Sequence, residues 1–324
     1  MAPMNELDPP GPGPLGAPAP GPLPDRRHDV EPTGLAALPA PPAPPEPPAP
    51  PEPPHGAPRW PLWHGLAAMA LSAVGVVALS IPVVLVARSL GLSTARPGPG
   101  FTVVLTVLND AVLVGCAVGM AALTVRPRLH HFGLRATPLW PAVGFCALGI
   151  GTYFVFGGLY EAIYPEQVKQ TTLDDLGAGR STVALVAIGV LLVVVAPIVE
   201  EFFFRGFLYR SLRTTLPIPA AALLGGLLFG AVHLSTGVAA TLPLAVLGVA
   251  FCLIVERTGS LYPVIALHAL VNSLAYSVSA DAPDGSATVA LPLLAAMLAG
   301  CLLLPRLARR SEVTGPAEPA PAPG

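Results

Sequence analysis

An all-α, polytopic membrane helix bundle is the fold class that this sequence predicts, and two observations support the prediction. Hydrophobic residues make up 53% of the 324 residues and charged residues only 11%, with a mean hydropathy of +0.66. Soluble domains carry about 25% charged residues. Apolar stretches of a length suited to a bilayer also recur along the chain. We therefore expect about eight transmembrane helices, at roughly 63–87, 102–125, 139–160, 182–204, 217–233, 238–255, 261–279 and 287–305.

The two ends of the chain differ from this apolar body. Residues 1–60 are dominated by Pro, Ala and Gly, and residues 311–324 are a shorter segment of the same kind. Such sequence lacks the apolar residues needed for a core and favours extended conformations. We predict disordered tails at 1–60 and 311–324 around a membrane domain at 61–310, whose motifs lie within 180–280.

The basic residues are distributed unevenly across the eight expected spans. Thirteen of the seventeen fall on one side and four on the other. Because cytoplasmic segments carry the excess of Lys and Arg, we expect an integral protein of the cell membrane with both termini in the cytoplasm. The thirteen are Arg26, Arg27, Arg59, Arg126, Arg128, Arg135, Arg205, Arg210, Arg213, Arg257, Arg306, Arg309 and Arg310.

The net charge and the cysteines argue against two classes of protein, namely nucleic-acid-binding proteins and proteins built on a framework of disulfides or cysteine-bound metals. A net charge of −2 gives no basic footprint, so we expect no nucleic-acid partner. The four cysteines lie apart in apolar segments and are expected to be small buried hydrophobic residues.

Two adjacent carboxylates, Glu200 and Glu201, lie within apolar sequence near the end of the fourth expected span. A charged side chain in hydrocarbon costs about 2.5–3.5 kcal/mol or more, so such residues face a partner or a cavity. Glu201 and Arg205 are four residues apart and share a helix face, which predicts an ion pair. Glu200 points elsewhere. Pro197, one turn earlier, is expected to bend the helix before the acids.

Three further polar side chains lie within the later spans. His233 follows Phe229 by four residues, at the end of a track of small residues, Ala222, Gly226 and Gly230, that permits close helix packing. His268 and Asn272 share one face of the seventh expected span. The carboxylate, imidazoles and amide could converge between helices. Asn109 and Asp110 form another intramembrane polar pair, but the sequence gives them no partner and they stay outside the predicted site.

This set of side chains suits the hydrolysis of an amide bond. A glutamate and an imidazole can share a water, with Glu200 taking its proton as general base. The other imidazole and the carboxamide can donate to the oxyanion. The set Glu200, His233 and His268 could instead hold zinc, although the spacings are long and an H-E-x-x-H motif is missing.

Three ordered segments resemble the motifs EExxxR, FxxxH and HxxxN of the CPBP family, the CAAX prenyl protease type II and bacteriocin-processing (Abi) membrane proteases. They are Glu200–Arg205, Phe229–His233 and His268–Asn272. The resemblance implies an active site below the cytoplasmic surface, with Glu200 as base acting with His233, and His268 with Asn272 as the oxyanion site. Glu201, Arg205 and Phe229 would support them. It leaves zinc open.

The predicted function is therefore an intramembrane endopeptidase, metalloprotease-like, that processes a membrane-associated protein, including lipidated ones. Membrane lipid and a peptide or protein substrate are the expected partners. Two alternatives stay open at this point: a catalytically silent scaffold or immunity-type interaction protein, and a transporter using the same buried acids. Against the last, the sequence contains no internal repeat.

Overall fold

The computed structural model describes residues 58–92, 98–164, 173, 176–234, 238–278 and 282–313, without the side chains of 238–240 and 308–313. Its contacts divide the chain into residues 1–48 and 49–324, and all described residues belong to the second unit. The predicted N-terminal tail, apart from residues 58–60, and residues 314–324 of the predicted C-terminal tail lie outside the described residues.

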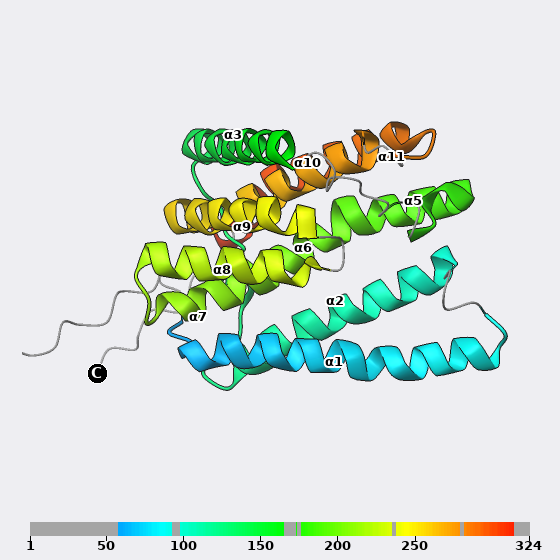
Figure 1. Ribbon diagram of the computed structural model, residues 1–324. Coiled ribbons are helices and arrows are strands. Elements are labelled where there is room, and N and C mark those ends of the chain that lie inside the picture. Colours follow the sequence, from blue (N-terminus) through cyan, green and yellow to red (C-terminus); the bar gives the residue numbers. More distant parts are fainter. Residues whose placement is uncertain are drawn as a thin grey trace, which may run out of the picture. The chain divides into compact units, whose positions relative to one another are not determined.

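The described part of the chain is a bundle of helices, which confirms the all-α prediction (Figure 1). Each expected span corresponds to a helix or a run of helices. In chain order these are α1 (Leu62–Ser89), α2 (Pro99–Ala122), α3 (Leu139–Ile163), α5 to α7 (Thr182–Arg213), α8 (Ile218–Val232), α9 (Val238–Thr258), α10 (Tyr262–Val278) and α11 (Ser286–Val313). Two short 3-10 turns, η2 (Leu129–Phe132) and η4 (Ala178–Arg180), lie in the connections.

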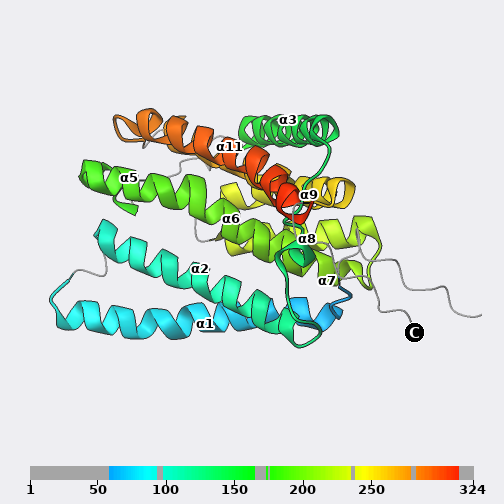
Figure 2. The same cartoon turned by 180° about the vertical axis from the view of Figure 1, so that it is seen from behind.

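Successive helices run in alternating directions, which both ribbon views show (Figures 1 and 2). The pairs α1–α2, α8–α9, α10–α11 and α3–α9 pack against one another. The helix α5 to α7 runs through the middle, between the α1–α2 pair and the pairs formed by α8 to α11. It contacts α1, α2, α8, α10 and α11, so the motif acids that it carries are surrounded by other helices.

The fourth span is longer than the sequence analysis predicted. It continues to Arg213 rather than ending at 204, as α5 (Thr182–Val190), η5 (Leu191–Val195), α6 (Ala196–Glu201), η6 (Phe202–Leu208) and α7 (Tyr209–Arg213). Glu200 and Glu201 therefore lie near its middle, not near its cytoplasmic end. Arg213 lies thirteen positions after Glu200, a rise of about 20 Å along the helix.

The helix can continue because its later charged residues have partners inside the bundle. Arg213 forms a salt bridge of 3.0 Å with Glu256 of α9, which also accepts a hydrogen bond from the Tyr209 hydroxyl at 2.9 Å. Arg210 donates to the carbonyl of Gly259. Arg205, Arg210 and Arg213 are all buried inside the bundle, so they should not be counted among the residues that flank the membrane. Without them the basic residues still divide ten to four.

Helices α8 and α9 approach each other through the predicted track of small residues. A Cβ atom on Gly226 would lie 2.7 Å from the backbone nitrogen of Val249 and from the carbonyl oxygen of Ala245. One on Gly230 would lie 2.6 Å from the carbonyl oxygen of Thr241. Such distances leave no room for a side chain, so close packing here requires glycine. This packing brings the end of α8 against the motif acids.

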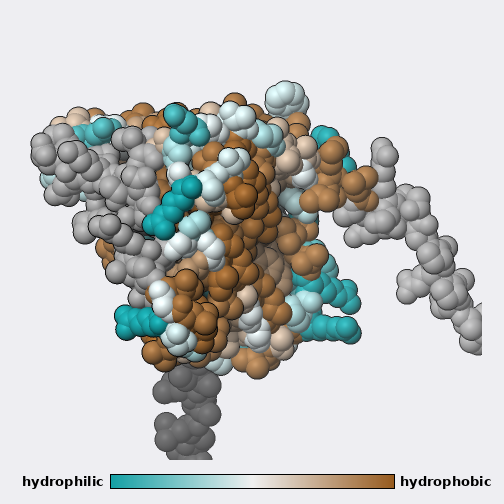
Figure 3. All heavy atoms as spheres, turned by 90° about the vertical axis from the view of Figure 1, so that its right-hand side faces the viewer, coloured by the Kyte–Doolittle hydropathy of each residue, from teal (hydrophilic) through white to brown (hydrophobic). Residues whose placement is uncertain are grey.

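The surface and the helix lengths fit a membrane protein. Large hydrophobic side chains are exposed along α1 and α3, including Val74, Leu85, Trp140 and Leu148, and hydrophobic atoms cover much of the face seen in Figure 3. Six of the described helices are long and apolar enough to cross a bilayer. The two shorter ones, α8 and α10, have 15 and 17 residues, so eight complete crossings stay a prediction. The four cysteines carry free thiols; Cys252 is buried, as expected, whereas Cys116, Cys146 and Cys301 are only partly buried.

Candidate active site

Glu201 and Arg205 form the predicted ion pair, and both are completely buried. Arg205 Nη1 lies 2.9 Å from Glu201 Oε1, with both side chains 0% exposed. The pair occupies the boundary of α6 and η6, one turn apart on the same face. A buried pair of this kind keeps its charges neutralised where water cannot do so.

Aromatic rings and one carbonyl complete the surroundings of Arg205. Its guanidinium carbon lies 4.2 Å from the centre of the Phe229 ring and 4.9 Å from that of Phe251. Its Nη2 donates to the carbonyl of Gly248 at 3.3 Å. Cation–π contacts of this kind are strongest when desolvated. Phe229 therefore supports the first motif by covering the cation of Arg205.

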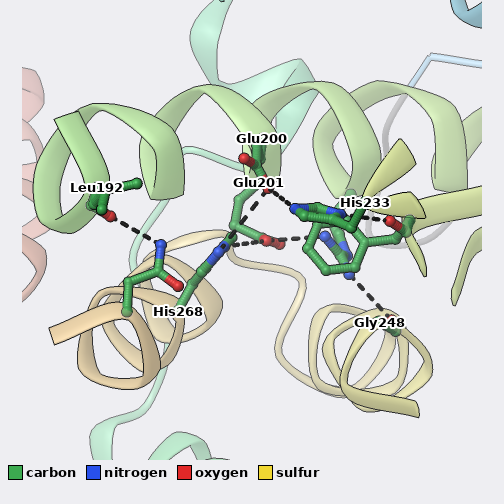
Figure 4. A network of polar contacts seen from close by, with 9 residues as sticks. Leu192, Glu200, Glu201, His233, Gly248 and His268 are labelled. Carbon is green, nitrogen blue, oxygen red and sulfur yellow. Dashed lines mark hydrogen bonds and ion pairs between the residues drawn. The ribbon is translucent and has the colours of Figure 1, made fainter. Parts of the chain in front are cut away.

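Glu200 faces two imidazoles from other helices (Figure 4). Its Oε2 lies 3.8 Å from His233 Nε2 and 4.0 Å from His268 Nε2. The Glu200 side chain is 20% exposed, whereas that of Glu201 is not exposed at all. Glu200 Oε2 makes no hydrogen bond to the described residues. Of the two adjacent acids, Glu200 is therefore the more exposed, although its Oε2 atom is itself buried.

The Nδ1 atoms of both imidazoles form hydrogen bonds on the side of the ring away from Glu200. His233 directly follows α8, and its Nδ1 lies 2.8 Å from the Phe229 carbonyl oxygen, which has no partner in the helix. His268 Nδ1 lies 2.9 Å from Glu201 Oε1. A carbonyl and a carboxylate can only accept, so each Nδ1 carries the hydrogen. Both Nε2 atoms are then turned toward Glu200.

Asn272 contacts the backbone just before the acids instead of Glu200. Its Nδ2 donates to the Leu192 carbonyl at 2.8 Å. Leu192 lies in the π-helical segment η5, where Ala196 N–H bonds the carbonyl five residues back. In that register the Leu192 carbonyl would require the N–H of residue 197, which Pro197 lacks. Asn272 supplies the missing donor. One of its two amide hydrogens is thus used structurally.

Asp110, which the sequence analysis left unassigned, approaches the site from α2. Val103 of α2 packs against a cluster on α5, and Ala117 against a cluster on η6. Asp110 is seven residues from each and shares their face. It is close enough to Glu200 for the two carboxylates to repel each other, and its buried Oδ2 has no hydrogen-bond partner among the described residues.

The donor set resembles a zinc site in chemistry but not in spacing. Two imidazole Nε2 atoms and one carboxylate are ligands that zinc prefers, and their outer hydrogen bonds are of the usual kind. However, Glu200 lies 3.8 and 4.0 Å from the two imidazoles. No group of three His, Cys, Asp or Glu side chains in the described residues is close enough to hold a metal ion. As they stand, these residues do not fit zinc.

Fold and site together define a class, the polytopic helical membrane protein with a buried glutamate–histidine site. Residues 182–274 match the family model of the type II CAAX prenyl endopeptidases, described as Rce1-like. This part of the chain holds all three motifs, so the match supports the CPBP resemblance found in the sequence. Searches of the curated proteins and of the solved structures find no match.

Several residues of the site could not be found from the motifs. Gly248 and Phe251 of α9 both contact Arg205, but neither residue has a polar side chain that would mark it as part of a site. Their spacing from Arg205 in the sequence carries no signal, because only the packing of α9 on α8 brings them there. Asp110 did have a signal, a carboxylate within an apolar span, but the sequence gave it no partner.

Proposed function

We propose that this protein is an intramembrane endopeptidase that hydrolyses a peptide bond of a membrane-associated or lipidated protein. The observation that carries the proposal is the position of Glu200. It is the more exposed of the two acids, and its Oε2, which is buried and has no hydrogen-bond partner among the described residues, lies 3.8 and 4.0 Å from two imidazole Nε2 atoms. Those gaps are too long for direct hydrogen bonds, and we propose that a water enters between Glu200 and the imidazoles.

The hydrogen-bond pattern supports a role for His233 beside Glu200. With its hydrogen on Nδ1, toward the Phe229 carbonyl, His233 presents a lone pair on Nε2. A water between them donates one hydrogen to Glu200 and the other to His233. A lone pair of the water oxygen is then left for attack on the substrate carbonyl. Glu200 takes the proton as the bond forms and later returns it to the leaving amine.

His268 is proposed as an oxyanion donor. Its Nδ1 hydrogen is bonded to Glu201, so donation to the substrate requires a second hydrogen on Nε2. In that form Glu200, Glu201, Arg205 and His268 carry two negative and two positive charges. Glu201 then acts through His268, by orienting it and balancing its charge. Asn272 can contribute its second amide hydrogen.

The test compares membrane proteomes of cells that contain the wild type, Glu200→Gln or Glu161→Gln. Glu161 is an exposed carboxylate near the end of α3 and is the matched control. We expect a new protein terminus with the wild type and Glu161→Gln that is lost with Glu200→Gln, because removing a general base slows a reaction by about 10²–10⁴-fold. The same terminus at wild-type abundance with Glu200→Gln would contradict the proposal.

Treatment of the purified protein with a chelator tests separately whether cleavage requires zinc. If Glu200 and His233 activate water directly, cleavage should persist after dialysis against a chelator. Cleavage that is lost and then restored by zinc would instead place Glu200, His233 and His268 around the ion.

A further inference from the structure

A groove of about 550 Å³ lies between α3, α10 and α11, apart from the candidate active site. Both ribbon views place α3 and α11 at the side of the bundle away from α1 and α2 (Figures 1 and 2). Its walls are apolar and include Ala147, Ile150, Leu267, Leu270 and Leu302. Leu302 is 42% exposed, so the groove opens on the outer surface of the bundle.

One end of the groove is polar and carries a positive charge. Thr137, Ser260 and Arg306 line it there, from the starts of α3 and α10 and the later part of α11. The two hydroxyls donate to backbone carbonyls, Thr137 to Thr258 and Ser260 to Arg135. Arg306 is exposed and is the charged residue of the lining, which contains no carboxylate. A ligand there would meet an apolar channel with a cationic mouth.

The groove and the candidate active site lie on opposite faces of α10. Pro263, Leu267 and Leu270 line the groove. His268 and Asn272, by contrast, contact Glu201 and the carbonyl of η5. At 100° per residue the two sets are roughly half a turn apart. A chain in the groove is therefore separated from Glu200 by the helix itself and cannot present a peptide bond to it.

We propose that this groove binds an anionic membrane phospholipid, with one acyl chain along α10 and the phosphate-bearing head group at Arg306. The apolar walls suit the chain, because each buried methylene contributes about 0.8 kcal/mol. The guanidinium at the mouth complements a phosphate and has no ion-pair partner among the described residues. A bound lipid would support α10 from behind the face that carries His268. The inference does not depend on the proposed protease function.

Thermal unfolding of the full-length protein in detergent tests the site, with phosphatidylglycerol or phosphatidylcholine of the same chains added. We expect phosphatidylglycerol to raise the unfolding temperature of the wild type more than phosphatidylcholine does. Arg306→Gln should weaken the apparent affinity for phosphatidylglycerol about fivefold, the contribution of one basic residue near anionic lipid. Arg257→Gln is the matched control, since Arg257 is exposed on α9 and outside the groove.

A second pair of variants tests the chain-binding part. Ala147→Phe places a ring in the groove and should abolish the response, whereas Leu148→Phe, on the neighbouring exposed position outside the lining, should keep it. An equal response to both lipids, or equal losses in the two arginine variants, would overturn the proposal. So would displacement of phosphatidylglycerol by a farnesylated peptide, which would make the groove a substrate site.

Discussion

Glu200 and Glu201 are adjacent in sequence but differ in almost every physical respect. Glu201 is unexposed and accepts hydrogen bonds from Arg205 and His268 through one oxygen. Glu200 is partly exposed and lies between two imidazoles without a direct hydrogen bond. Helical spacing was enough to predict this division, because the Glu201–Arg205 pair lies within one helix.

The two acids should respond differently to substitution. Glu201→Ala or Arg205→Ala strands a buried charge and is expected to cost about 3–5 kcal/mol of stability. Glu200→Gln keeps the shape of the side chain and should unfold near the wild-type temperature. Thermal unfolding in detergent measures both. The double variant, Glu201→Ala with Arg205→Ala, should cost less than the sum of the two single changes. A stable Glu201→Ala protein would contradict the ion-pair argument.

Asp110 carries a cost that substitution can reveal. One of its oxygens is buried without a hydrogen bond to any described residue, and its charge and that of Glu200 repel each other. Asp110→Asn removes the buried negative charge and its repulsion with Glu200, and should therefore raise the unfolding temperature. Asp284→Asn, at an exposed turn, is the control and should change little. Destabilisation by Asp110→Asn would show that the carboxylate has a favourable partner.

At the scale of elements, the helix that carries the acids is interrupted twice by π-helical turns, η5 and η6. Such turns are rare in proteins, and those that do occur are frequently found at functional sites. In η5 the cause is visible, because Pro197 cannot bond the Leu192 carbonyl and Asn272 does so from α10. The π-helical turn η5 thus leaves the Leu192 carbonyl without a helical partner, and Asn272 of the third motif supplies the missing hydrogen bond.

A double-mutant cycle tests that coupling. Asn272→Ala leaves the Leu192 carbonyl unsatisfied and should cost about 1–3 kcal/mol. Pro197→Ala restores a backbone N–H that can take its place. In the Pro197→Ala background, Asn272→Ala should therefore cost clearly less, as judged by unfolding in detergent. Equal costs in the two backgrounds would mean that the hydrogen bond does not replace the one lost to Pro197.

The sequence predicted the helices well but misplaced the end of one. Hydropathy ends a span where charges begin, and so it placed the limit of the fourth helix at 204. Arg210 and Arg213 can lie inside the bundle only because Gly259 and Glu256 meet them there. Those partners are more than forty residues away in the sequence, so no local sequence pattern predicts these contacts. The same holds for Asn272, whose structural partner depends on a π-helical register.

At the scale of the whole described unit, the alternating helices collect the basic residues at one end. The connection from α2 to α3 lies at the same end of the bundle as the end of α9 and the later part of α11 (Figures 1 and 2). These segments carry Arg126 and Arg128, Arg257, and Arg306. This arrangement agrees with the asymmetry used to predict cytoplasmic termini. Reporters fused after Gly324 and inserted at residue 170 should report opposite sides of the membrane. A cytoplasmic reporter at residue 170 would contradict the predicted topology.

The shortness of α8 has a consequence for the lipid around it. Its 15 residues rise about 22 Å, against about 30 Å of hydrocarbon. Leu223 and Leu227 on this helix are 55% and 49% exposed, so α8 faces lipid along that side. If α8 crosses the bilayer completely, we expect the bilayer to thin around it, because a hydrophobic mismatch costs a fraction of a kcal/mol per Å. Reconstituted protein should therefore unfold at a higher temperature in short-chain than in long-chain bilayers, and the reverse order would show that α8 is not bordered by lipid. Membrane thickness thus becomes a variable that acts on the helix preceding His233.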